Sequence, residues 1–117
     1  MERETIAGAE RLPDGQYKFT VDRKPEKTLT KSGHAQRIWI LGYVKNGAEK
    51  QFKFKLFPSD YRPIVLSLGG VKNGSDIDWD ADSVEGKIFK CELRTVKSDD
   101  GKYENYRFEN CEQEIPF

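Results

Sequence analysis

One helical stripe, set between segments that alternate, constrains the fold of this chain most strongly. Four apolar side chains recur at the helical spacing i, i+3, i+4 and i+7: Tyr61, Ile64, Val65 and Leu68. On both sides of the stripe, apolar and polar residues alternate as they do in half-buried β-strands. The segments expected to be strands are residues 16–22, 37–44, 50–57, 87–96 and 102–112. The sequence therefore predicts three strands, one short helix and two further strands.

The residues around the stripe predict where the helix begins and ends. Asp60 is a suitable N-cap and would place Pro63 in the first turn, where its missing N–H leaves no hydrogen bond unmade. Gly69 and Gly70 end the helix. This order of elements is that of the oligonucleotide/oligosaccharide-binding (OB) fold, a five-stranded barrel. In that fold the helix lies between the third and fourth strands.

The length of 117 residues fits a single domain, and 12 Tyr and Phe with two Trp supply material for a core. We expect an all-β protein with an N-terminal arm at residues 1–15, an OB-fold domain at residues 16–112 and a C-terminal tip at residues 113–117. Residues 1–15 lack the apolar segment of a signal peptide, and no stretch is long enough to span a bilayer. These features predict a cytoplasmic protein.

Residues that carry catalysis or bind metals are few. Two cysteines, Cys91 and Cys111, and one histidine, His34, form no zinc-binding pattern and are too few for a disulfide scaffold. No motif for an activated nucleophile or a phosphate-binding loop is present. The sequence therefore predicts a protein that is not an enzyme and that needs no cofactor or metal.

The formal net charge is zero, but the charges are unevenly distributed. Residues 16–57 contain ten Lys or Arg and three Asp or Glu, a balance of +7. Residues 70–86 contain one Lys and five acids (−4), and residues 109–117 contain three acids and no base (−3). This asymmetry predicts one basic face and two acidic segments. Within the basic region, residues 23–36 are expected to form a long loop.

The turn between the second and third strands decides which side chains the second strand presents outward. With a type I turn and a bulge at Gly47, Trp39 and Tyr43 point outward beside Lys53 and Lys55. That surface would be an aromatic and cationic platform, suited to stack bases and to neutralise phosphates. With a tight two-residue turn, the opposite side of the second strand faces the core, and Trp39 is buried. We favour the outward orientation, and the buried one stays open.

Charges predict the register of the last hairpin. With residues 98–101 as the loop, apolar side chains meet apolar ones and Glu92 lies opposite Arg107. This register puts Cys91 on the inner face and Cys111 on the outer face, so an intramolecular disulfide is not expected. The basic loop would border the binding groove of an OB barrel and could close over a single strand. The candidate DNA-binding residues are Lys24, Lys27, Lys31, Arg37, Trp39, Tyr43, Lys53, Lys55, Arg94, Tyr103 and Arg107.

The chain ends in EQEIPF, with large apolar side chains at a terminus that is usually solvated. This ending resembles the acidic C-terminal tip of bacterial single-stranded DNA-binding proteins, which closes on an acid followed by Ile-Pro-Phe. The segments LPDGQYKFTV, EKTLTKSGHA and DWDADSVEGKIFKCEL are similar to small phage-encoded single-strand binding proteins. The resemblance implies a tip that recruits replication and repair enzymes. The tip residues are Glu112, Glu114, Ile115, Pro116 and Phe117.

We therefore expect a protein that binds and protects single-stranded DNA, without strong sequence preference, during phage DNA replication or recombination in the host cytoplasm. A homodimer is expected, because linking two small grooves raises affinity. The alternative is an OB-fold adaptor or inhibitor whose ligand is a protein. The choice between DNA and RNA stays open, since aromatic platforms accept either.

Overall fold

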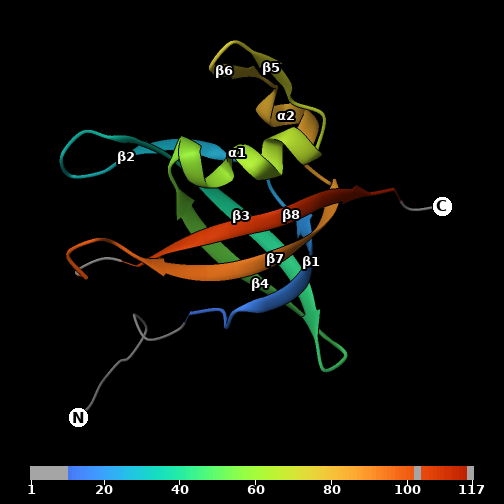
Figure 1. The fold of residues 1–117 in the computed structure, drawn as a ribbon. Helices are drawn as coiled ribbons and strands as arrows, with labels where there is room; N and C mark the ends of the chain where they lie inside the picture. Colours follow the sequence, from blue (N-terminus) through green and yellow to red (C-terminus); the bar gives the residue numbers. More distant parts are fainter. Residues whose placement is uncertain (1–10, 102–103, 116–117) are drawn as a thin grey trace.

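Strands dominate the computed structural model, which describes residues 11–101 and 104–115 (Figure 1). In chain order the elements are β1 (Gly15–Val21), β2 (Glu26–Leu29), β3 (Ala35–Lys45), β4 (Ala48–Leu56), α1 (Pro58–Ser67), β5 (Val71–Asn73), β6 (Asp76–Asp78), α2 (Ala81–Val84), β7 (Ile88–Lys97) and β8 (Glu104–Glu114). The predicted all-β class is confirmed, and α1 lies between the third and fourth of the long strands. Within the described residues, no helix has the length and apolar character needed to cross a membrane.

The long strands form one antiparallel sheet in the order β4–β3–β1–β7–β8. The same edge of β3 pairs with β2 at residues 35–38 and with β1 at residues 41–42. Among the described residues, no backbone pairing joins the two outer strands, β4 and β8. The sheet is therefore not closed by hydrogen bonds, and it has one strand more than the five expected. A separate hairpin, β5 with β6, lies beyond α1 (Figure 1).

The core lies between one face of this sheet and α1, which crosses one end of the sheet (Figure 1). The four side chains of the predicted helical stripe are all buried. From the strands, the largest fully buried side chains are Phe19, Trp39, Phe54, Phe89 and Phe108. Burial of large aromatic side chains is the main source of stability in a domain of this size.

Helix α1 begins earlier than predicted. Phe57 is the N-cap and Pro58 is the first helical residue, where proline needs no hydrogen-bond donor. Asp60 lies in the first turn, and its Oδ2 accepts a hydrogen bond from the Phe57 N–H at 3.0 Å. The prediction of Asp60 as N-cap was therefore wrong, and Pro63 lies inside the helix. The helix ends as predicted, since Gly69 has a positive φ of 106°.

The predicted basic loop contains a strand. Residues 26–29 form β2, which pairs antiparallel with the start of β3. A short turn closes this hairpin, with the Thr30 N–H donating to the His34 carbonyl at 2.9 Å. Gly33 has a positive φ of 88° in that turn. The loop prediction was wrong for residues 26–29 because four residues are too few for alternation to be recognised.

The β3–β4 hairpin has the two-residue turn, at Asn46 and Gly47, with φ of 53° and 78°. Trp39 consequently faces Phe54 across the two strands, and its indole is fully buried. The favoured outward orientation of Trp39 was wrong. The structure has the buried orientation, which the sequence analysis had left open. The outer face of β3 carries instead the two half-buried isoleucines, Ile38 and Ile40.

The β7–β8 hairpin differs from its predicted register by two residues. Glu92 lies opposite Glu109 rather than opposite Arg107. Because a shift of two preserves which side chains point inward, both registers bury the same apolar residues. Farther along this hairpin, β8 contains a bulge. Two of its residues, Asn110 with a φ of 54° and Cys111, lie opposite the single residue Cys91 of β7. The additional residue reverses the direction of the next side chain on β8.

Candidate nucleic-acid interface

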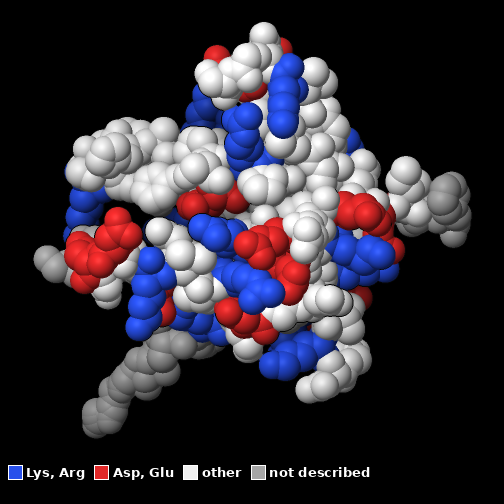
Figure 2. Space-filling model, viewed as in Figure 1, with Lys and Arg blue, Asp and Glu red and all other residues white. Residues whose placement is uncertain are grey.

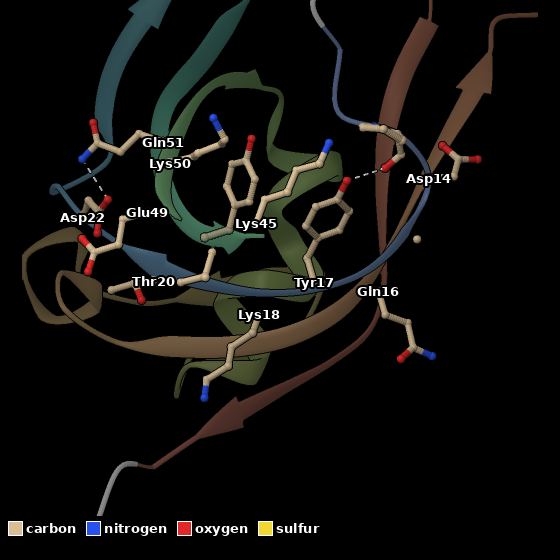
Figure 3. A pocket seen from close by; sticks show the side chains of 15 residues that line it. Asp14, Gln16, Tyr17, Lys18, Thr20, Asp22, Lys45, Glu49, Lys50 and Gln51 are labelled. Carbon is tan, nitrogen blue, oxygen red and sulfur yellow. Dashed lines mark hydrogen bonds between the residues drawn. The ribbon is translucent and has the colours of Figure 1, made fainter. Parts of the chain in front are cut away.

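A cleft of about 1110 Å³ opens where β1 and β3 diverge (Figure 3). The two strands pair only at residues 20–21 of β1 and 41–42 of β3. Beyond that point, the first half of β1 and the β3–β4 hairpin form the walls of the cleft. The separation of the two strands therefore creates a concave surface that the linear sequence does not indicate.

Two tyrosines line this cleft, Tyr17 from β1 and Tyr43 from β3. Their ring centroids are 5.8 Å apart and the rings are nearly perpendicular. Tyr17 also stacks on Phe19, with centroids 5.0 Å apart, and its hydroxyl donates to the Pro13 carbonyl at 2.8 Å. Both tyrosines are half-buried, so one part of each ring is held by the core and another part remains accessible. Burial is the main cause that raises the pKa of Tyr17.

Two lysines of the hairpin point into the same space, Lys45 and Lys50 (Figure 3). Among the described residues neither has an ion-pair partner, and both are exposed. Lys18 points to the other side of β1, where its Nζ lies 3.6 Å from Glu114 Oε2. The free cations of the cleft therefore come from the β3–β4 hairpin.

Carboxylates also line the cleft, and two of them are held by hydrogen bonds. Asp14 Oδ1 accepts from the Thr95 N–H at 2.9 Å, and Asp22 Oδ2 accepts from Gln51 Nε2 at 2.9 Å. Glu49 lies near the tip of the hairpin. The lining thus carries three lysines and three acids, and its net charge is close to zero.

The outer face of β4 carries two further lysines, Lys53 and Lys55. They lie opposite Ile40 and Ile38 of β3, and both are exposed without an ion-pair partner in the described chain. Their outward orientation is as predicted. They share that face with isoleucines, however, and not with Trp39 and Tyr43, which were expected beside them and lie on the inner face of β3.

The β2–β3 hairpin carries Lys27 and Lys31, which are exposed and form no ion pair with a described residue. A second, smaller pocket of about 440 Å³ lies between this hairpin and α1. Arg37 lines it but is held in place, because its Nη1 donates to the Pro25 carbonyl at 2.9 Å and its guanidinium lies 4.8 Å above the Trp79 ring. Arg37 is therefore engaged within the protein.

Three other predicted DNA-binding cations are paired with carboxylates. Arg94 Nη2 lies 2.7 Å from Glu92 Oε2, and Arg94 Nε lies 3.0 Å from Glu109 Oε1. The negative charge of Glu92 is the main cause that raises the pKa of Arg94, and Glu109 contributes to the same shift. Arg107 is 3.8 Å from Glu109, and Lys24 is 2.9 Å from Asp82. Figure 2 shows Lys and Arg next to Asp and Glu over β7 and β8. These cations would have to give up a partner to bind a phosphate.

The described part of the C-terminal tip is an extension of the sheet. Strand β8 continues through Glu114, so Glu112 and Glu114 lie opposite Lys90 and Ile88 of β7. Ile115 follows the strand and is 63% exposed. The remaining predicted residues, Pro116 and Phe117 of the tip and Tyr103 of the DNA-binding set, lie outside the described residues.

The described end of the predicted N-terminal arm packs against the sheet. Leu12 is buried, and its N–H donates to the Tyr106 hydroxyl at 3.1 Å. The Arg11 guanidinium lies 4.5 Å above the Tyr106 ring. This segment therefore covers part of the core, at the side of the cleft where Pro13 and Asp14 lie.

Sequence reasoning missed Tyr17, Lys45 and Lys50 as candidate site residues. Tyr17 lies on the inner face of β1, beside Phe19. Only the divergence of β1 from β3 opens that inner face to solvent. The two lysines flank the Asn46–Gly47 turn, and they could have been included had the two-residue turn been favoured.

Neither a protein-family model nor a curated protein matches this chain. The fold and the site therefore define its class: an antiparallel β protein with a tyrosine-lined cleft between lysines on the β3–β4 hairpin and carboxylates at the two ends of β1.

Proposed function

We propose that this protein binds single-stranded DNA without strong sequence preference. Bases occupy the cleft against Tyr17 and Tyr43, and phosphates follow the lysines of the β3–β4 hairpin. The observation that carries the proposal is the convergence of two half-buried tyrosine rings with Lys45 and Lys50. Aromatic rings stack on every base, and lysines neutralise phosphates without reading the sequence.

The distribution of ion pairs supports this arrangement. On β7 and β8 the arginines at positions 94 and 107 have glutamate partners, whereas Lys53 and Lys55 on β4 have none among the described residues. A polyanion binds most favourably to cations that do not first have to break an ion pair with a carboxylate. The cleft itself has little net charge, so the exposed lysines of β4 supply the phosphate contacts that the cleft lacks.

We also propose that the sheet is an OB-type barrel that side chains close. Its strand order and the position of α1 between β4 and β7 support this assignment. The ring of Phe54 on β4 lies 4.9 Å from the ring of Tyr106 and 5.4 Å from that of Phe108, both on β8. Aromatic contacts thus join the two outer strands where backbone pairing is absent, in keeping with the partly open barrel of OB folds.

Recruitment of replication and repair enzymes by the C-terminal tip, a role in phage DNA metabolism and a homodimeric state complete the proposal. The resemblance of EQEIPF to the bacterial tip supports the first of these. The exposure of Ile115 agrees with a tip that is accessible to a partner.

The test is a titration with labelled oligo-dT and with duplex DNA of equal length at several salt concentrations. We expect tighter binding to the single strand, with log K falling linearly against log salt at about 0.7 per phosphate contact. Tyr43→Ser should weaken binding by about 1–3 kcal/mol, and Tyr43→Phe, which keeps the ring, should not. Equal affinity for single-stranded and duplex DNA would reject the proposal.

A protein-binding module is the second candidate, and the balanced charge of the cleft favours it. A peptide that carries both signs of charge could pair with the lysines of the hairpin and with Asp14 and Asp22, which flank β1. This reading predicts no binding to oligo-dT even at low salt. The titration described above therefore separates the two candidates.

A further inference from the structure

The two cysteines of the chain lie together in the structure, although the sequence separates them by 20 positions. Cys91 is buried on the inner face of β7, and Cys111 is half-buried on β8. On either side of them the strands pair Lys90 with Glu112 and Glu92 with Glu109. Cys91 therefore lies opposite the bulge that contains Cys111.

The bulge is what brings the two thiols to the same side of the sheet. In a regular register Cys91 and Cys111 would point to opposite faces, as the sequence predicted. The additional residue, near Asn110 with its positive φ, turns Cys111 inward so that it packs against the core. The pKa of Cys111 is lowered and that of Cys91 is raised, in each case mainly through the interaction between the two thiols.

An open pocket of about 450 Å³ lies beside Cys91. Cys91 lines the pocket together with Asn110 and Glu112, the two chain neighbours of Cys111. Small polar reagents therefore have a path to Cys91, and Cys111 is itself only half-buried. The described residues contain no third His, Cys, Asp or Glu positioned to complete a metal site with them.

We propose that Cys91 and Cys111 form an oxidisable dithiol, which hydrogen peroxide converts to an intrachain disulfide between β7 and β8. The two residues lie on neighbouring strands, with Cys91 opposite the bulge that contains Cys111, so the bond requires only local adjustment. This proposal does not depend on the ligand of the cleft.

The reaction proceeds in two steps. The Cys111 thiolate attacks one oxygen of hydrogen peroxide, the O–O bond breaks, and hydroxide leaves and takes up a proton to become water. The sulfur of Cys91 then attacks the sulfenic acid, so that an S–S bond forms, the S–O bond breaks and a second water leaves with the thiol proton. Two thiols lose two electrons in total, and peroxide is reduced to two molecules of water.

The disulfide would fix β8 to β7 immediately before the last residues of the strand. Glu112 and Glu114 follow the bulge, and Ile115 extends from the end of β8. Oxidation would therefore lock the part of the sheet from which the C-terminal residues emerge.

The test is treatment of the reduced full-length protein with a small excess of hydrogen peroxide, followed by intact mass measurement and non-reducing peptide mapping. We expect a monomer that has lost two hydrogen atoms, about 2 Da. Mapping should find Cys91 linked to Cys111, and dithiothreitol should restore the original mass. A product that gains oxygen atoms, disulfide-linked dimers or an unchanged mass would each overturn the proposal.

Two matched variants test which sulfur reacts first. In Cys91→Ser, the sulfenic acid on Cys111 lacks its partner and should be trapped by dimedone. In Cys111→Ser, Cys91 loses its neighbouring thiol and should react roughly tenfold more slowly, because it remains a buried thiol. Faster trapping on Cys91 than on Cys111 would contradict the assigned order. Peptide mapping of the wild-type protein keeps the test decisive should a serine variant fail to fold.

Discussion

Trp39 and Phe54 face each other across β3 and β4, and both rings are buried in the core. The indole also stacks on Trp79, with centroids 5.9 Å apart and planes 17° apart. Trp39 therefore connects the sheet to the segment that precedes α2. Among the described residues its Nε1–H has no hydrogen-bond partner. Trp39 therefore stabilises the fold through the buried area of its ring and not through its N–H group.

Replacing Trp39 should therefore affect stability. We expect Trp39→Ala to lower the free energy of unfolding by about 3–5 kcal/mol, because it leaves a large cavity in the core. Trp39→Phe should cost much less, since it retains an aromatic ring and removes an unpaired buried donor. Urea unfolding of both variants measures the difference. An alanine variant of normal stability but weak DNA binding would contradict the buried position.

The turn that determines this register can be tested at Gly47. Its φ of 78° lies in the left-handed region, so Gly47→Ala should destabilise the protein by about 1–2 kcal/mol. Asn46→Gly is the matched control, because φ at Asn46 is 53° and glycine adopts that conformation without strain. Thermal unfolding provides the measurement. Equal melting temperatures for Gly47→Ala and the wild type would argue against the two-residue turn.

The contrast between free and paired cations predicts where DNA lies. Lys53→Ala combined with Lys55→Ala should reduce the slope of log K against log salt by about 1.4, or 0.7 for each lost contact. Arg94→Ala combined with Arg107→Ala removes the same charge, but these arginines already have glutamate partners. We expect that control to change the slope little. A larger effect of the arginine pair would place the DNA on β7 and β8.

Asp60 should contribute to the pH dependence of stability. Burial is the main cause that raises its pKa above 3.8, and the hydrogen bond from the Phe57 N–H opposes this shift. A raised pKa in the folded state means that the folded chain binds the proton more tightly than the unfolded chain. The resulting stabilisation is present below pH 3.8 and is lost as the pH rises through the folded-state pKa.

The variant Asp60→Asn isolates this effect, since the amide oxygen can still accept from the Phe57 N–H but does not titrate. The unfolding free energy of the wild type minus that of the variant should decrease as the pH is raised from below 3.8 toward neutrality. Urea unfolding at a series of pH values provides this difference. A difference that is constant, or that increases with pH, would contradict the raised pKa.

The registers of the two long hairpins explain why only part of the site could be predicted. For β3 and β4, a change of one residue in the turn decides whether Trp39 is buried, and Asn46–Gly47 is compatible with more than one turn. For β7 and β8, two registers bury the same apolar side chains, so the sequence pattern does not distinguish them. The observed register puts Glu92 opposite Glu109, and Arg94 then binds both acids.

The sequence by itself determined the all-β class, the helical stripe with Tyr61, Ile64, Val65 and Leu68, and the inward side of β1, β4, β7 and the part of β8 before the bulge. These features depend on local periodicity, which neighbouring residues in the chain establish. Only the tertiary structure decided that Trp39 is core, that Cys91 and Cys111 meet, and that Tyr17 and Tyr43 line one cleft. Those outcomes depend on turn length, on a single bulge and on the divergence of two strands, because each follows from contacts between residues distant in the chain.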